Sequence, residues 1–275
     1  MIIAAYSKQD TAGTNIAKQV LNSYPFTITG ATFEEEPIYT AQINGNRINL
    51  ITLRDQTIYA QNLPQHFENI ELLVFLSRHS SQSGKPTLSV HSTGNFGNAD
   101  LGGLPRTLSI CPATSMRDAL QALSKFKAEA NLGYEVSYEC THHGPSLKVP
   151  TMFVELGSSA QQWGDMKAAE AVAKAAIEAI TKFQPNPSQT AALGIGGPHY
   201  NQRFTQMALD NEAIFGHMIP KYALQLVDSH MLQQCVSATT EKVTHAILDW
   251  KGIPGKDKPR ILEALDHINL PYTKT

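Results

Sequence analysis

The apolar run at 71–77, with the sequence ELLVFLS, restricts the fold of this chain more than any other feature. It has the length of a strand and no alternation of polar and apolar residues, which is typical of a central strand covered on both faces. Further runs of strand character lie at 2–6, 87–91, 134–141, 151–156, 190–195 and 244–250. Helical patterns lie between them, at 11–21, 116–130, 163–183, 203–213, 223–232 and 258–268. Strands that alternate with helices predict a layered α/β fold.

The chain shows no repeat at a fixed period and no low-complexity linker, so we expect one domain over residues 1–275. We also expect the protein to be a monomer. The stretch 27–62 is expected to form a small β-rich insertion. Asn44-Gly45 lies inside a strand-like run at 43–52, and Asn-Gly is a typical hairpin turn.

The composition is that of a soluble globular protein, with 42% hydrophobic and 17% charged residues. The formal net charge of −2 argues against a protein that binds DNA or RNA mainly through phosphate contacts. Three widely spaced cysteines form no CxxC pair, which suits a reducing compartment. The start has no basic, apolar leader, and no apolar run reaches the ~18 residues of a membrane span, so we expect a cytoplasmic protein without membrane contact.

Three loops combine histidine with glycine, and each follows a predicted strand. They are HSTGNFG from His91, THHGP with His142 and His143, and GGPHY with His199. Ligands bind at the carboxyl ends of strands in open α/β sheets, and glycine there lets the backbone approach a ligand closely. From these loops we expect substrate contacts by Gly94, Asn95, Phe96, Gly97, Gly196, Gly197 and Tyr200. Turn formation explains each loop equally well when it is taken alone.

A carboxylate joins the histidines at the strand ends. Glu155 ends one predicted strand, and Ser158 and Ser159 then lead into a helix whose N-terminus can hold an anionic group of the substrate. Neighbouring residues at a strand end point in opposite directions. We therefore expect only one of His142 and His143 to face a given neighbour in the site.

The shared position of these groups predicts a hydrolytic site, with or without zinc. Imidazole is a general base near neutral pH and a zinc ligand. The N–H groups of Gly196 and Gly197 are expected to face the substrate's carbonyl oxygen. The absence of HExxH, GxSxG, Rossmann and P-loop motifs excludes the enzyme classes that depend on them. The predicted catalytic residues are His91, His142, His143, Glu155 and His199, of which the first four are also the predicted zinc ligands.

The three histidine-glycine loops and the segment from Glu155 to Ser159 occur in the same order as in the archaeal-type D-aminoacyl-tRNA deacylases. Two further segments also match this family: Ser77-Arg78-His79, and GHMIPKYA from Gly216. The chain resembles this family over its whole length. The resemblance implies an enzyme of translation quality control, which cleaves the ester between a D-amino acid and the 3′ end of tRNA. It also implies a phosphorylase/hydrolase-like, three-layer α/β/α sandwich with a mixed sheet, a link to zinc, and D-aminoacyl-tRNA as the partner.

Two other functions stay open at this point. The same histidines and glutamate would also serve a zinc-dependent exopeptidase or amidohydrolase, which cleaves a peptide or amide. Alternatively, they are structural parts of a non-catalytic module that binds the acceptor end of tRNA. The weak net charge does not exclude a tRNA substrate, because an enzyme that releases tRNA after each turnover does not need tight phosphate binding.

Overall fold

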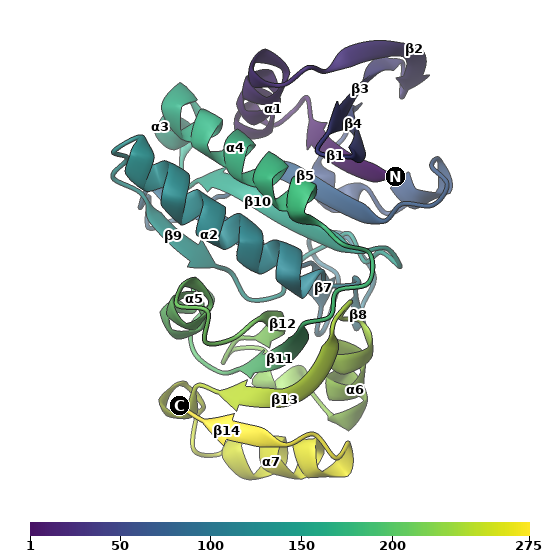
Figure 1. Ribbon diagram of the computed structural model, residues 1–275. Helices are drawn as coiled ribbons and strands as arrows, with labels where there is room; N and C mark the ends of the chain where they lie inside the picture. The colour runs from purple at the N-terminus through teal and green to yellow at the C-terminus, as the bar shows by residue number, and fades with distance from the viewer.

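The computed structural model describes all residues from 1 to 275 and divides the strands between two larger sheets (Figure 1). The main sheet has eight strands in the order β2-β3-β4-β1-β5-β10-β6-β9. Strands β4, β1, β5 and β10 are parallel neighbours, whereas β2, β3 and β4 form an antiparallel meander and β6 runs antiparallel to β10. The predicted α/β fold with a mixed sheet is confirmed. The strands are β1 (Ile2–Ser7), β2 (Thr27–Phe33), β3 (Glu36–Ile43), β4 (Asn46–Leu53), β5 (Leu72–Arg78), β6 (Thr87–His91), β9 (Glu135–Tyr138) and β10 (Thr151–Gly157).

The second sheet is parallel throughout, in the order β12-β11-β13-β14. A short antiparallel ladder joins β7 to β8, and β7 holds the first glycine of the loop that follows His91. In Figure 1 the second sheet lies below the main sheet, at the end of the molecule that carries the C-terminus. The strands are β7 (Gly94–Asn95), β8 (Thr107–Leu108), β11 (Thr190–Ile195), β12 (Phe215–Ile219), β13 (Lys242–Leu248) and β14 (Tyr272–Lys274).

Helices α1, α2 and α4 cover one face of the main sheet (Figure 1). Aspartates start two of them: Asp10 accepts hydrogen bonds from the first turn of α1, and Asp165 does the same for α4. The buried side of α4 is mostly alanine, which allows α2 to pack closely against it. The α-helices are α1 (Thr11–Ser23), α2 (Ala113–Glu129), α3 (Ala160–Trp163), α4 (Met166–Lys182), α5 (Gln202–Leu209), α6 (Ser229–Ser237) and α7 (Lys258–His267), and the 3₁₀ helices are η1 (Thr57–Tyr59), η2 (Leu63–Gln65), η3 (Leu224–Leu226) and η4 (Trp250–Gly252).

The other face of the main sheet is covered by irregular chain. Phe75 and Phe153 project from β5 and β10 on this side, with ring centroids 4.6 Å apart, and pack with Leu63 of η2 and Leu147. Glu155 lies two residues after Phe153 on β10 and therefore points to the same face. This face, without a layer of α-helices, holds the candidate site.

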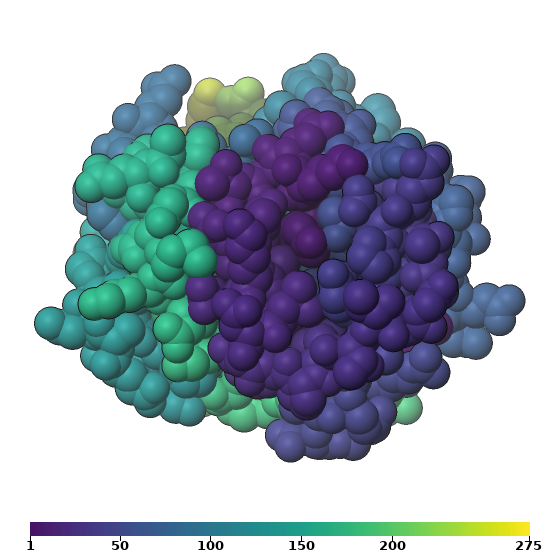
Figure 2. All heavy atoms as spheres, turned by 90° about the horizontal axis from the view of Figure 1, so that it is seen from above, coloured from purple at the N-terminus to yellow at the C-terminus, as the bar shows by residue number.

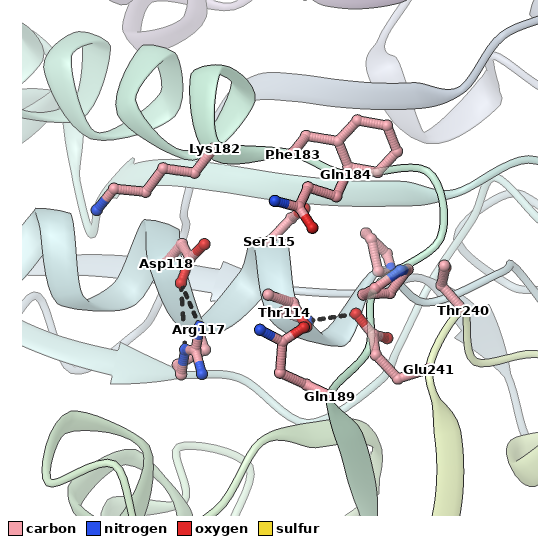
Figure 3. A pocket seen from close by; sticks show the side chains of 12 residues that line it. Thr114, Ser115, Arg117, Asp118, Lys182, Phe183, Gln184, Gln189, Thr240 and Glu241 are labelled. Atoms are coloured by element: carbon pink, nitrogen blue, oxygen red, sulfur yellow. Dashed lines mark hydrogen bonds and ion pairs between the residues drawn. The ribbon is translucent and has the colours of Figure 1, made fainter.

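The two sheets share one apolar core and a polar link. The largest buried cluster combines main-sheet residues such as Val74 with Phe215 and Ile247 from the second sheet. Glu241, just before β13, accepts hydrogen bonds from the backbone N–H groups of Ala113 and Thr114 at the start of α2. Figure 3 shows the bond from Thr114. The carboxylate thereby accepts hydrogen bonds from N–H groups that have no carbonyl partner within the helix. The single domain over residues 1–275 stays a prediction, and a core shared by the two sheets is consistent with it.

Several expected elements differ from the observed ones. The residues of the expected helix 223–232 are divided between η3 and α6, and β12, at 215–219, was not expected. The stretch 27–62 contains β2, β3, β4 and η1, and its strands extend the main sheet. Figure 2 shows these N-terminal segments (purple) over one end of the molecule, beside the chain of α3 and α4. No helix is both long and apolar enough to cross a membrane.

Candidate active site

Histidines and glutamates from four segments meet at one cavity of about 310 Å³. Three of these segments follow β5, β9 and β11, and the fourth lies in β10. The segment after β1 adds Asp10. Because Asp10, Glu139 and Glu155 all line it, we call it the acidic cavity. Its other polar side chains include Ser7, Ser77, Arg78, His79, His142, His143, His199 and Tyr200.

Strand direction explains how these groups meet, and it differs from the sequence-based expectation. Strands β5 and β10 are parallel, so Ser77 and Glu155 lie side by side near their carboxyl ends. Strand β6 runs the opposite way, and His91 at its end lies beside Phe153 in the middle of β10. We expected the histidines and Glu155 to meet where the carboxyl ends of the strands lie side by side. That expectation is wrong for His91. The site forms on the face of the sheet, where antiparallel neighbours also meet.

His91, His142 and His143 form a tight group. The ring centroid of His91 is 4.3 Å from that of His142 and 4.9 Å from that of His143, and the rings of the pair are 4.3 Å apart. The Nδ1 atom of each ring lies beside a backbone carbonyl. That of His91 is 3.2 Å from the Ser92 carbonyl, that of His142 is 2.8 Å from the Cys140 carbonyl, and that of His143 is 2.7 Å from the Gly144 carbonyl. A carbonyl only accepts, so each Nδ1 carries the proton and each Nε2 offers a lone pair.

Both members of the histidine pair face this group, contrary to the expectation that only one would. The expectation assumed extended backbone, in which neighbouring side chains alternate. His143 instead has φ of 39°, in the left-handed region. This turn of the backbone brings both rings to His91.

Burial keeps these three imidazoles neutral. Removal from water lowers the pKa of His91 to about 4 and that of His143 to about 3, and the neighbouring histidines add to the effect on His143. The pKa of His142 is also well below its ordinary value, for the same reasons. His91 Nε2 is buried and has no hydrogen-bond partner within the protein.

Glu139 is the centre of a second group. Its Oε2 accepts a hydrogen bond from His199 Nε2 at 2.9 Å and lies 3.7 Å from His142 Nε2, and its Oε1 lies 3.2 Å from His79 Nδ1. Burial disfavours its charge, but these partners outweigh burial and hold the pKa of Glu139 well below its ordinary range. Contact with Glu139 likewise outweighs burial at His79, whose pKa is raised.

Glu155 has the opposite electrostatic character. Its Oε2 lies 3.6 Å from His91 Nε2 and 3.8 Å from His79 Nδ1. Burial first, and then the negative charge of Glu139, raise the pKa of Glu155 well above its ordinary value. The two glutamates therefore differ in how strongly each holds a proton, as in other sites where one carboxyl exchanges a proton and its neighbour stays charged.

Two tyrosines complete the wall around His199. The hydroxyl of Tyr200 lies 3.1 Å from His79 Nε2, and that of Tyr222 lies 3.1 Å from His199 Nδ1. Burial raises the pKa of Tyr200 to about 12, so it is a neutral hydrogen-bonding group.

The glycine loop after His91 forms a second cavity, of about 330 Å³, which we call the glycine-loop cavity. It includes the expected substrate-binding residues Gly94, Asn95, Phe96 and Gly97, and shares His142 and His143 with the acidic cavity. Gly94 has φ of +149°, and a Cβ there would lie 2.6 Å from Leu108 Cδ2. A side chain would thus clash with β8, so only glycine fits.

Four other expected substrate contacts are occupied within the protein. The N–H groups of Gly196 and Gly197 donate to the carbonyls of Ile219 and Gly252, so neither is free to face a substrate oxygen. Ser158 Oγ donates to the Lys85 carbonyl, and Ser159 caps α3 together with Gln162. None of the four lines either cavity. The loop after β11 instead contributes His199 and Tyr200 to the acidic cavity.

Sequence reasoning missed Glu139 and Tyr222 and gave His79 little weight. Glu139 belongs to the polar side of an alternating strand, which is usually solvent-exposed, yet it is only 1% exposed because the loop after β11 covers it. Its position three residues before His142, at the end of a strand, is the signal that could have identified it.

The donor atoms in the site could hold a metal ion. The ligand atoms of His91, His142 and His143 lie within 4.8 Å of one another. Two further sets, each of three residues, meet the same limit and share Glu139. One joins Glu139 to His142 and His199, and the other joins it to His79 and Glu155.

The two sequence comparisons agree on one family. A sequence model of the family described as D-aminoacyl-tRNA deacylase matches residues 66–273, which include every histidine and glutamate of the site. The D-aminoacyl-tRNA deacylase of Pyrococcus furiosus is 34% identical, with 100% of both chains covered, and that of Korarchaeum cryptofilum is 36% identical over 97% of this chain and 90% of its own. The crystal structure of a conserved protein of unknown function aligns with a TM-score of 0.87 at 30% identity, covering 100% of this chain and 95% of the other. The chain belongs to the D-aminoacyl-tRNA deacylase family.

Proposed function

We propose that this protein hydrolyses the ester between a D-amino acid and the 3′ end of tRNA, and that cleavage occurs where the acidic cavity meets the His91, His142 and His143 group. Family membership supports the reaction and separates it from the exopeptidase and binding-module alternatives. The observation that carries the location is the shared orientation of the three imidazoles, each with Nδ1 bound to a carbonyl.

The same three imidazoles fit a zinc ion. Histidine ligands typically donate their other ring nitrogen to a carbonyl or carboxylate, which fixes the tautomer and the ring orientation. His91 adds a buried Nε2 that lacks a hydrogen-bond partner within the protein. We therefore assign His91, His142 and His143 as the residues that would hold zinc, with Glu155 next to them rather than in the central group. When bound, zinc would supply a Lewis acid for the ester carbonyl or for a water.

The two glutamates have different roles in the reaction. Glu155 lies 3.6 Å from His91 Nε2, and its raised pKa makes its deprotonated form a stronger base than an ordinary carboxylate. That form takes a proton from the attacking water and then returns it to the departing 3′ oxygen. The water oxygen bonds to the carbonyl carbon, the bond from that carbon to the 3′ oxygen breaks, and D-amino acid and tRNA are released. Glu139 stays charged and holds His199 and His79 in position.

The decisive assay compares D-Tyr-tRNA with L-Tyr-tRNA and with a panel of peptides, with and without a chelator. We expect preferential cleavage of the D-ester, loss of activity with chelator, and recovery on adding zinc. Cleavage of peptides alone would overturn the proposed reaction, and full activity after complete metal removal would overturn the zinc assignment.

Glutamate variants test the location. Glu155→Gln should lower kcat by about a hundredfold, because general acid–base catalysis typically contributes that much or more. Glu135→Gln is the matched control, since Glu135 lies on β9 with a side chain that is 55% exposed and pairs with Lys85. Equal rates for the two variants would place the proton transfer elsewhere.

A further inference from the structure

The acidic cavity and the glycine-loop cavity meet at His142 and His143, which line both. The ester of an aminoacyl-tRNA lies between its two halves, the amino acid and the terminal nucleoside. An ester cleaved at the shared histidines therefore has one half in each cavity. The remaining question is which half each cavity takes.

Carboxyl groups distinguish the two cavities. Three carboxyl side chains line the acidic cavity, those of Asp10, Glu139 and Glu155, and the guanidinium of Arg78 and the imidazole of His79 lie beside them. The glycine-loop cavity is lined by a single carboxyl group, that of Asp100. An aminoacyl ester carries an α-ammonium group, whereas the nucleotide carries phosphates. Carboxyl oxygens accept hydrogen bonds from an ammonium group, whereas phosphate oxygens cannot donate any to them, so the ammonium favours the cavity with three carboxyl groups.

Exposed apolar side chains distinguish the glycine-loop cavity further. Tyr222 is 60% exposed and Leu226 is 47% exposed, and both line this cavity. The Tyr222 hydroxyl is held by His199, so the ring is fixed while much of it faces solvent. Proteins bind unpaired nucleotides by stacking bases on exposed aromatic rings of this kind. The exposed residue Lys221 is next in the chain, where a phosphate that follows the base could meet it.

We propose that the glycine-loop cavity binds the unpaired 3′-terminal nucleoside, with its base stacked on Tyr222, and that the acidic cavity binds the D-amino acid by its ammonium group. This assignment rests on the proposed function and adds the orientation of the substrate. It makes Tyr222 a nucleoside-binding residue with no direct role in the chemistry.

The first test measures binding without turnover. A CCA trinucleotide whose terminal adenine is replaced by 2-aminopurine loses fluorescence when that base stacks on an aromatic ring. Wild-type protein and Tyr222→Phe should quench it, and Tyr222→Leu should bind it about tenfold more weakly, which is within the range of one stacked base. Tyr272→Leu on β14 is the matched control and should bind like the wild type. Equal quenching by Tyr222→Leu and wild type would overturn the nucleoside assignment.

The second test uses three esters. For Tyr222→Leu, the loss in kcat/KM should be at least about fivefold larger with D-Tyr-tRNA than with D-tyrosine ethyl ester, which has no nucleoside. For the wild type, N-acetylation of D-Tyr-tRNA removes the ammonium and should lower kcat/KM about tenfold. Equal losses on the two esters, or equal cleavage of the acetylated substrate, would overturn the corresponding half of the orientation. Absence of any cleavage of D-Tyr-tRNA by the wild type would instead refute the proposed function, while the 2-aminopurine result would stand.

Discussion

His217 offers a quantitative test of how the histidine loop is held in place. It lies fully buried in β12, where its Nε2 faces the carbonyls of Ser109 at 3.1 Å and Ala238 at 3.2 Å. Both carbonyls accept, so Nε2 carries the proton, and Nδ1 accepts from the hydroxyl of Thr141 at 3.0 Å. Thr141 directly precedes the histidine pair. His217 thus connects the second sheet to the loop that enters the site.

Burial lowers the pKa of His217 from 6.5 to about 4. A lowered pKa in the folded state means that the unfolded chain binds the proton more readily. The stabilising contribution is complete above pH 6.5, declines as the pH falls toward 4, and is fully lost below that. The difference of about 2.5 pKa units corresponds to about 3 kcal/mol in total, of which about 2 kcal/mol is lost by pH 5.

The perturbation is His217→Gln, which keeps a donor for the two carbonyls but cannot titrate. Urea unfolding at pH 7.5 and pH 5.0 gives the free energy of unfolding for the variant and the wild type. Wild-type protein should lose about 2 kcal/mol more than the variant between these pH values. His230→Gln, on the exposed side of α6, controls for substitution of a histidine as such. Parallel pH curves for wild type and His217→Gln would refute the reasoning.

Three further predictions concern the site itself. His91→Ala and His143→Ala should each lower kcat/KM for D-Tyr-tRNA at least about tenfold and reduce bound zinc measured by mass spectrometry; near-normal deacylation by both variants would contradict the assigned group. Glu139→Gln should lower kcat about tenfold to a hundredfold and alter the pH–rate profile, since it removes the charge that contacts His199 and His79; an unchanged profile would show that Glu139 serves only the fold. Gly94→Ala should lower the free energy of unfolding by about 2 kcal/mol, because the added Cβ would clash with β8. Gly133→Ala is the control and should not lower it, since no atom lies within 4 Å of the Cβ added there. Thermal unfolding of the two variants gives the comparison.

Local patterns in the sequence were enough to place most of the secondary structure. The run at 71–77 corresponds to β5, the run at 87–91 to β6 residue for residue, and the Asn44-Gly45 turn to the β3–β4 hairpin. Such elements depend on side chains that are close together in the chain. Strand β12 was not predicted, because the residues of FGHMI include glycine and histidine and its burial comes only from the elements packed around it.

The sequence by itself therefore determined the α/β class, the order of the elements, and the loops that carry the chemistry. Tertiary structure alone decided how those loops meet. The antiparallel direction of β6 placed His91 opposite Phe153, the left-handed turn at His143 brought both neighbouring histidines to one side, and the loop after β11 buried Glu139 among them. Strand direction and burial arise from contacts between residues distant in sequence, and no local pattern records them. For the same reason Gly196 and Gly197, which resembled a substrate cradle, prove to donate to carbonyls of the protein itself.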